Sequence, residues 1–387
     1  MNTGYNETSV ITKEKERIPE KENQPDLRVN TQEGDFFLVS RFRGSIMGFA
    51  SLWIIFFHEW IKLLDNHPVG SAVEGFIKSI GFCGVDIFML LSGIGLFFSM
   101  QKKKVSLPVF YYKRFKRIIL PAVTVATLRF LIEKWPFELY INNISGINFY
   151  KVSMYCFLWY VPAIATLYIA FPFYYKLFSR SSHPVIFTFG AIQIWLVITL
   201  WVRDSMRGDL FGFTNRIPIF IIGVLFGWLI KNVKMKFSLS VWIFFGVMLI
   251  LGGYLEYLAR FKGMYILVPS SDCCLPNILM SVSLSILMAK GFDILCKVKY
   301  IKIFGTALVR VLAFFGTFSF EFYCVQEWLS DIIIPKMTGN YPPLVINITI
   351  LATITAVSFT AHLIFNQFWK LIEFLAGKIR SAVCPGK

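Results

Sequence analysis

The residues best suited to chemistry lie near the end of an apolar stretch, Arg43 to Trp60, which reads RGSIMGFASLWIIFFHEW. Two ionisable residues, His58 and Glu59, follow a pair of phenylalanines there. An ionisable side chain is costly in lipid, so within a membrane segment it normally faces a protein-lined or water-filled interior and marks a functional site. A neutral histidine in such a place suits the role of general base. The alternative is a histidine at headgroup level, where Trp60 is also typical.

Two further stretches carry carboxylates that need partners if they are buried. Asp86 lies in GFCGVDIFMLLSGIGLF, and the pattern is compatible with either structural pairing or support of catalysis. Glu321 and Glu327 lie in FGTFSFEFYCVQEW, and at least one of them must lie at depth, within reach of a pocket. Small residues spaced through the Asp86 stretch favour close helix packing; they are Gly81, Gly84, Gly93 and Gly95.

A basic segment, FYYKRFKRIILP, is a candidate anion site. Arg114 and Arg117 are three residues apart and therefore share one face at the start of a helix. Two neighbouring guanidinium groups can hold a phosphate through paired hydrogen bonds. The competing interpretation is an anchor that binds anionic lipid headgroups.

The elements that must position these residues are membrane helices. Of the 387 residues 56% are hydrophobic and only 16% are charged, and the apolar runs are continuous rather than alternating. This composition predicts an all-α, polytopic transmembrane bundle and argues against a β-barrel. The net charge of +16 does not indicate nucleic acid, because the basic residues cluster in short loops. We predict about ten spans, near residues 44–64, 79–99, 118–135, 153–175, 184–203, 216–231, 239–258, 275–291, 307–330 and 344–368.

Charge distribution predicts the topology and the domain limits. Most of the 39 basic residues fall on one side of the membrane if the N-terminus is cytoplasmic, which places both termini in the cytoplasm. We expect a disordered N-terminal tail at 1–40, one transmembrane domain at 41–370 and a short C-terminal tail at 371–387. The seven cysteines lack zinc-type spacing, so we expect neither a metal site nor a disulfide framework.

Several motifs, in this order, resemble the acyltransferase 3 family of integral membrane acyltransferases. They are FFHEW, GFCGVDIFMLLSGIGLF, the pair Arg114 and Arg117 followed by Pro121, LWYVPAIATLY, NRIPIFIIGVLFG and GTFSFEFY. The resemblance covers roughly residues 41–370. Each motif is weak by itself, and the shared order and spacing make the match specific.

The resemblance implies a membrane O-acyltransferase, most often an O-acetyltransferase, of the bacterial cytoplasmic membrane. Its donor would be cytoplasmic acetyl-CoA or another acyl-CoA, and its acceptor a hydroxyl of a cell-surface or envelope carbohydrate, such as an exopolysaccharide. It makes His58 the catalytic histidine and places Arg114 and Arg117 on the donor side. We add Asp86 and Glu327 as candidate catalytic residues.

Two positions depart from the family pattern. Many members carry an arginine where this chain has Met47, and Arg43, one turn earlier, is the candidate replacement. Members often carry a histidine where this chain has Gln326. These departures concern the donor contacts and the acceptor rather than the class of reaction.

The alternative function is a transporter or flippase of a lipid-linked sugar, with His58 and Asp86 as a proton relay. Transporters often show internal repeats and paired broken helices, which we do not find in the sequence. A sensor is disfavoured by the short loops. The expected partners are acyl-CoA, a glycan or lipid-linked saccharide and the bilayer, without nucleic acid. The acceptor sugar, the acyl chain and the oligomeric state, a homo-oligomer included, stay open.

Overall fold

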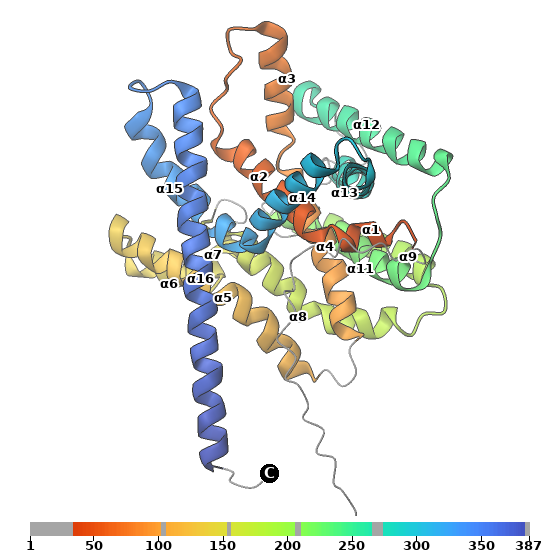
Figure 1. Cartoon of the computed structure of the whole chain (residues 1–387). Coiled ribbons are helices and arrows are strands. Elements are labelled where there is room, and N and C mark those ends of the chain that lie inside the picture. Colours follow the sequence, from red (N-terminus) through yellow and green to blue (C-terminus); the bar gives the residue numbers. More distant parts are fainter. Residues whose placement is uncertain (1–33, 102–105, 153–155, 206–209, 265–273, 384–387) are drawn as a thin grey trace, which may run out of the picture.

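The computed structural model describes residues 34–101, 106–152, 156–205, 210–264 and 274–383, and the regular secondary structure in these ranges is helical (Figure 1). Within these ranges, seven helical segments are long and apolar enough to cross a membrane, or eight if the bent pair α14–α15 is one span. The helices are α1 (Phe37–Arg41), α2 (Arg43–Glu59), α3 (Pro68–Ser79), α4 (Cys83–Met100), α5 (Leu107–Glu133), α6 (Phe137–Ile144), α7 (Ile147–Val152), α8 (Tyr160–Phe178), α9 (Pro184–Ser205), α10 (Phe211–Thr214), α11 (Ile217–Asn232), α12 (Leu239–Lys262), α13 (Cys274–Lys297), α14 (Lys302–Thr317), α15 (Ser319–Met337) and α16 (Pro343–Val383).

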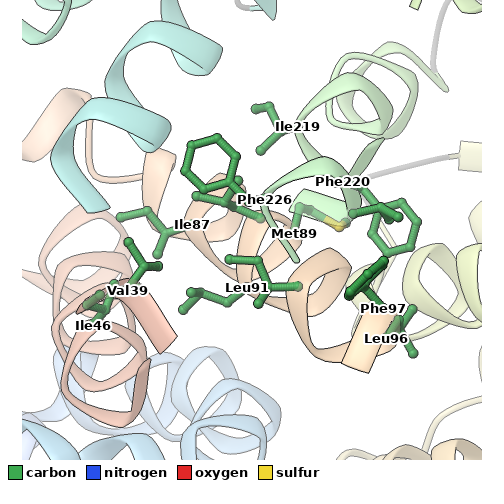
Figure 2. Close-up of a cluster of buried hydrophobic side chains, with 14 of the residues drawn as sticks. Val39, Ile46, Ile87, Met89, Leu91, Leu96, Phe97, Ile219, Phe220 and Phe226 are labelled. Atoms are coloured by element: carbon green, nitrogen blue, oxygen red, sulfur yellow. The ribbon is translucent and has the colours of Figure 1, made fainter. Parts of the chain in front are cut away.

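The core is built on the contact between α4 and α11. A side chain at Gly93 would collide with the carbonyl of Phe220, and one at Gly223 would collide with the carbonyl of Leu90. The two backbones therefore touch, as small residues allow in membrane helices. Figure 2 shows the apolar side chains around this contact, among them Ile87, Met89, Leu91, Phe97, Ile219 and Phe226. The packing role predicted for the glycines of the Asp86 stretch is confirmed at Gly93.

Helix α2 is fixed in the same manner against α14. A Cβ at Gly48 would overlap the carbonyl oxygen of Leu312. One turn away, the Ser45 hydroxyl donates a hydrogen bond to the carbonyl of Val309 over 2.8 Å. These contacts set the position of α2, and hence of the histidine near its end.

The segment predicted as one span at 307–330 is divided in the structure. Helices α14 and α15 are bent by 74° at Phe318, which is fully buried. The ring of Phe318 packs edge-on against Phe314 and Phe322, so aromatic burial stabilises the break. The bend brings α15 against both α2 and α5.

Helices α1 and α16 overlap the predicted tails, whose limits stay predictions. Residues 1–33 lie outside the described residues, but α1 begins within the predicted tail at 1–40, and the Asp35 carboxylate accepts a hydrogen bond from the Phe237 N–H over 2.7 Å. Helix α16 runs through most of the predicted tail at 371–387. The ten-span count and the cytoplasmic termini stay predictions.

The cysteines whose side chains are described are free thiols, namely Cys83, Cys156, Cys296 and Cys324.

Candidate functional site

The three arginines predicted to bind the donor converge on one cavity of about 80 Å³ between α2, α4, α5, α8 and α15. Arg43 comes from α2, whereas Arg114 and Arg117 come from α5. The guanidinium of Arg43 lies against Gly95, where an added Cβ would be 3.0 Å from Nη2. That of Arg114 lies 5.7 Å from the ring centre of Phe110. We call this space the arginine cavity; its size and charge suit a narrow anionic ligand.

Helix α2 leads from the arginine cavity to the predicted base. Arg43, Met47 and Ile54 line the cavity at spacings that place them on one helical face. His58 follows Ile54 by one turn on that face. Its imidazole is exposed, packs edge-on against Phe57 at 4.6 Å, and makes no hydrogen bond within the described residues. His58 therefore lies next to the cavity rather than in its wall.

Helices α5 and α15 show the same arrangement. Tyr323 lines the cavity and Glu327 lies one turn further on the same face of α15. Ile118 lines it from α5, and Arg129 follows eleven residues later, close to the same face. Glu327 is exposed, and the charges of Arg129 and Asp331 act on it. We call the following residues the charged rim: His58, Arg129, Glu327 and Asp331.

Arg129 is held in place by charges and rings. Its Nε donates to Glu133 over 3.0 Å, and its Nη2 donates to Asp331 over 3.1 Å. The guanidinium carbon lies 4.5 Å from the ring centre of Phe157 and 5.3 Å from that of Trp135. The Trp135 indole N–H also donates to Glu133, over 2.8 Å. These contacts connect α5 to α15 at the charged rim.

Asp86 lies behind the cavity wall. Its carboxylate is fully buried and forms an ion pair with Arg216, with 3.4 Å between Oδ1 and Nε. The Arg216 guanidinium lies 5.4 Å from the ring centre of Trp159 and donates to the carbonyl of Gly212. The neighbouring Val85 lines the arginine cavity, whereas Asp86 does not. The geometry matches the structural pairing considered for Asp86, and its catalytic role stays a prediction.

A strained turn at Leu158 joins these parts. Leu158 is buried and has a φ of +58°, which is rare for a bulky residue and costs roughly 1–3 kcal/mol. On one side of it, Trp159 lies over Arg216. The next residue, Tyr160, donates its backbone N–H to the Tyr323 hydroxyl over 3.0 Å. One turn of backbone thus connects α8 to the buried ion pair and to α15.

Sequence reasoning missed Arg216, Arg129 and Leu158, and the hydrogen bond between Tyr160 and Tyr323. A signal existed for Arg216, because a buried Asp86 needs a cation and NRIPIFIIGVLFG supplies one. A weaker signal existed for Arg129, a lone arginine in an apolar stretch. No signal pointed to Leu158, since leucine is not enriched in left-handed turns, or to the bond between Tyr160 and Tyr323, which are far apart in sequence.

One comparison with known proteins is informative. The model of the acyltransferase 3 family, described as an acyltransferase domain, matches residues 47–365. The match contains every predicted site residue except Arg43, which precedes it. No curated protein and no solved structure matches the chain.

Proposed function

The chain belongs to the acyltransferase 3 family, and from that premise we propose that it is a membrane O-acetyltransferase. It moves the acetyl group of acetyl-CoA to a hydroxyl of a cell-surface or envelope carbohydrate, in the bacterial cytoplasmic membrane. One observation supports this proposal most: three arginines from two helices meet in one cavity, and His58 follows on the same face of α2.

The arginine cavity is the donor end of the proposed site. Arginine binds phosphate through charge-assisted, paired hydrogen bonds, so Arg43, Arg114 and Arg117 suit the phosphates of CoA. The cavity of about 80 Å³ is too small for a nucleotide, since ligand pockets commonly measure about 300–1,000 Å³. The nucleotide therefore stays at the mouth, and the extended pantetheine arm runs along α2 toward His58. From Met47 to His58 the helix rises about 16 Å.

Transfer takes place at the charged rim in a single displacement. His58 takes the proton of the acceptor hydroxyl as its oxygen attacks the thioester carbonyl. The new C–O bond forms, the C–S bond breaks, and the CoA thiolate leaves and receives the proton. Glu327 accepts a hydrogen bond from a neighbouring hydroxyl of the acceptor, and Arg129 lies where its charge stabilises the developing oxyanion.

Donor binding tests the proposal. Arg114→Ala and Arg117→Ala should each weaken acetyl-CoA binding to the purified protein about 10- to 100-fold, the loss of a charge-assisted hydrogen bond. Lysine at either position should restore only part of the affinity. Lys113→Ala is the matched control, because Lys113 is exposed on the same helix and does not line the cavity. Equal affinity in all three alanine variants would instead favour the lipid-anchor interpretation.

The bend between α14 and α15 favours a second candidate, a flippase for a lipid-linked sugar. Broken helices at a binding site are typical of transporters, and Ser319, at the break, lines the arginine cavity. Family membership supports transfer over transport. Acetyl transfer by detergent-purified protein, where no membrane separates two compartments, distinguishes the two functions.

A further inference from the structure

The structure contains a lateral groove that the proposed reaction does not use. It has a volume of about 330 Å³ and lies between α5, α8 and the α6–α7 segment. Its long walls are apolar and come from two neighbouring helices, which contribute Ile118, Ala122, Ala126, Val161, Ala165 and Ile169. Residues 143–146 and Tyr150 of the α6–α7 segment line the groove as well, and Figure 1 shows α6 beside α5.

The two ends of the groove differ in chemistry. Near one end, Ile119 and Ile169 are 50% and 54% exposed, so the groove opens on a surface suited to lipid tails. At the other end, Phe157 and Leu158 line the groove, and the polar side chains of Asn143 and Ser145 belong to the wall that the α6–α7 segment forms. Apolar walls that run from a lipid-facing opening toward this second end fit a single hydrocarbon chain.

The Phe157 end of the groove adjoins the charged rim. Phe157 lines the groove, and the Arg129 guanidinium lies 4.5 Å from its ring centre. Leu158, which forms the strained turn, lines the groove as well. A headgroup at this end would therefore meet Arg129 and the carboxylates around it.

The charge around that end indicates the kind of headgroup. Three carboxylates interact with Arg129: Glu133 and Asp331 form ion pairs with it, and its charge acts on Glu327. Carboxylates accept hydrogen bonds from hydroxyl groups and repel phosphate. The surplus of negative charge favours a neutral, hydroxyl-rich head.

We propose that this groove holds the hydrocarbon chain of a glycolipid whose headgroup is an uncharged saccharide, so that the acceptor reaches the charged rim from within the bilayer. The proposal rests on the proposed function for the fate of the headgroup, but not for binding itself. It predicts a binding site that recognises the hydrocarbon chain and the sugar of the same molecule together.

Photo-crosslinking tests this with the full chain in phosphatidylcholine nanodiscs. The probe is an alkyl maltoside with a diazirine in its dodecyl chain, and adducts are mapped by peptide mass spectrometry. We expect adducts on α5 and α8 peptides, reduced at least fivefold by excess dodecyl maltoside. Maltose alone, or dodecylphosphocholine with the same chain, should reduce them less than twofold.

Groove-filling variants sharpen the test. Ala165→Phe should remove most of the α8 adduct, whereas Ile250→Phe, at a 74% exposed position of α12, should not. Acetyl-CoA affinity should be unchanged in Ala165→Phe. If the wild-type chain did not bind acetyl-CoA at all, the proposed function would be refuted, but the glycolipid site in the groove would not. Equal competition by dodecylphosphocholine, or adducts spread over all lipid-facing helices, would overturn the glycolipid site, since the groove would then hold any lipid.

Discussion

The arginine cavity and the charged rim lie on the same faces of α2, α5 and α15 but differ in how they are built. The charged side chains that line the cavity are the arginines Arg43, Arg114 and Arg117. The rim mixes charges and is open, with an exposed His58 and an exposed Glu327. The difference suggests that the cavity is preformed for binding an anion, whereas the rim is completed by its substrate.

The two regions also differ in what fixes their shape. Behind the cavity wall lie the fully buried pair Asp86–Arg216 and the strained turn at Leu158. At the rim, Arg129 is held by Asp331, whose side chain is 56% exposed. Buried pairs are costly to break, whereas exposed pairs contribute little. Substitutions at the two places should therefore fail in different ways.

The largest expected effect is at the rim. His58→Gln should lower acetyl transfer per mole of purified enzyme by about 10²- to 10⁴-fold, because glutamine cannot accept the proton. Acetyl-CoA affinity should stay within twofold, since the arginine cavity is unchanged. The rate of the wild-type enzyme should rise with pH as His58 loses its proton, and residual His58→Gln activity should lack this rise. Near-normal turnover in His58→Gln would end the general-base hypothesis.

A second prediction compares two aspartates. Asp86→Asn leaves Arg216 buried without its counter-charge and should destabilise the fold by about 3–5 kcal/mol. Asp331→Asn at the rim should cost about 0–1 kcal/mol, because its pair is exposed. Thermal unfolding in one detergent measures both variants. If Asp331→Asn proved as destabilising as Asp86→Asn, the contrast between a preformed cavity and an open rim would be wrong.

These contrasts also show where sequence reasoning succeeded. The helical class and the shared face of Arg114 and Arg117 follow from local pattern, because apolar period and helical spacing are encoded within one element. That Arg43 lines the same cavity was expected only from the family resemblance. The ion pair of Asp86 with Arg216 was foreseen only as a need for some cation. The bend at Phe318 and the position of Arg129 depend on contacts between elements distant in the chain, which local spacing does not encode.

The third prediction removes one hydroxyl group from the cavity wall. Tyr323→Phe deprives the Tyr160 N–H of its acceptor, and a buried donor without a partner costs about 1–3 kcal/mol. Tyr168→Phe is the matched control, because Tyr168 lines the same cavity and its hydroxyl makes no hydrogen bond within the described residues. We expect lower stability and weaker acetyl-CoA binding only in Tyr323→Phe. Identical melting temperatures in the two variants would show that this bond does not shape the cavity.

The smallest expected effect concerns the backbone at Leu158. It is the difference in stability between two variants, Leu158→Ala and Leu158→Gly. Both Leu158→Ala and Leu158→Gly remove the same buried apolar side chain, which should cost about 2–5 kcal/mol. At an ordinary helical position glycine is the worse of the two by about 0.5–1 kcal/mol. At a φ of +58° the order should reverse by about 1 kcal/mol, because glycine has no Cβ to strain.

Thermal unfolding of both variants in the same detergent measures which of them is more stable. The control pair is Leu167→Ala and Leu167→Gly, at a buried position within α8, where alanine should be the more stable variant. Glycine should be the better residue at 158 and the worse residue at 167. Donor affinity should follow the same order at 158 if the turn shapes the arginine cavity through Tyr160 and Tyr323. Alanine proving better than glycine at both positions would mean that Leu158 carries no strain, and the cavity would then owe its shape to the buried ion pair and helix packing alone.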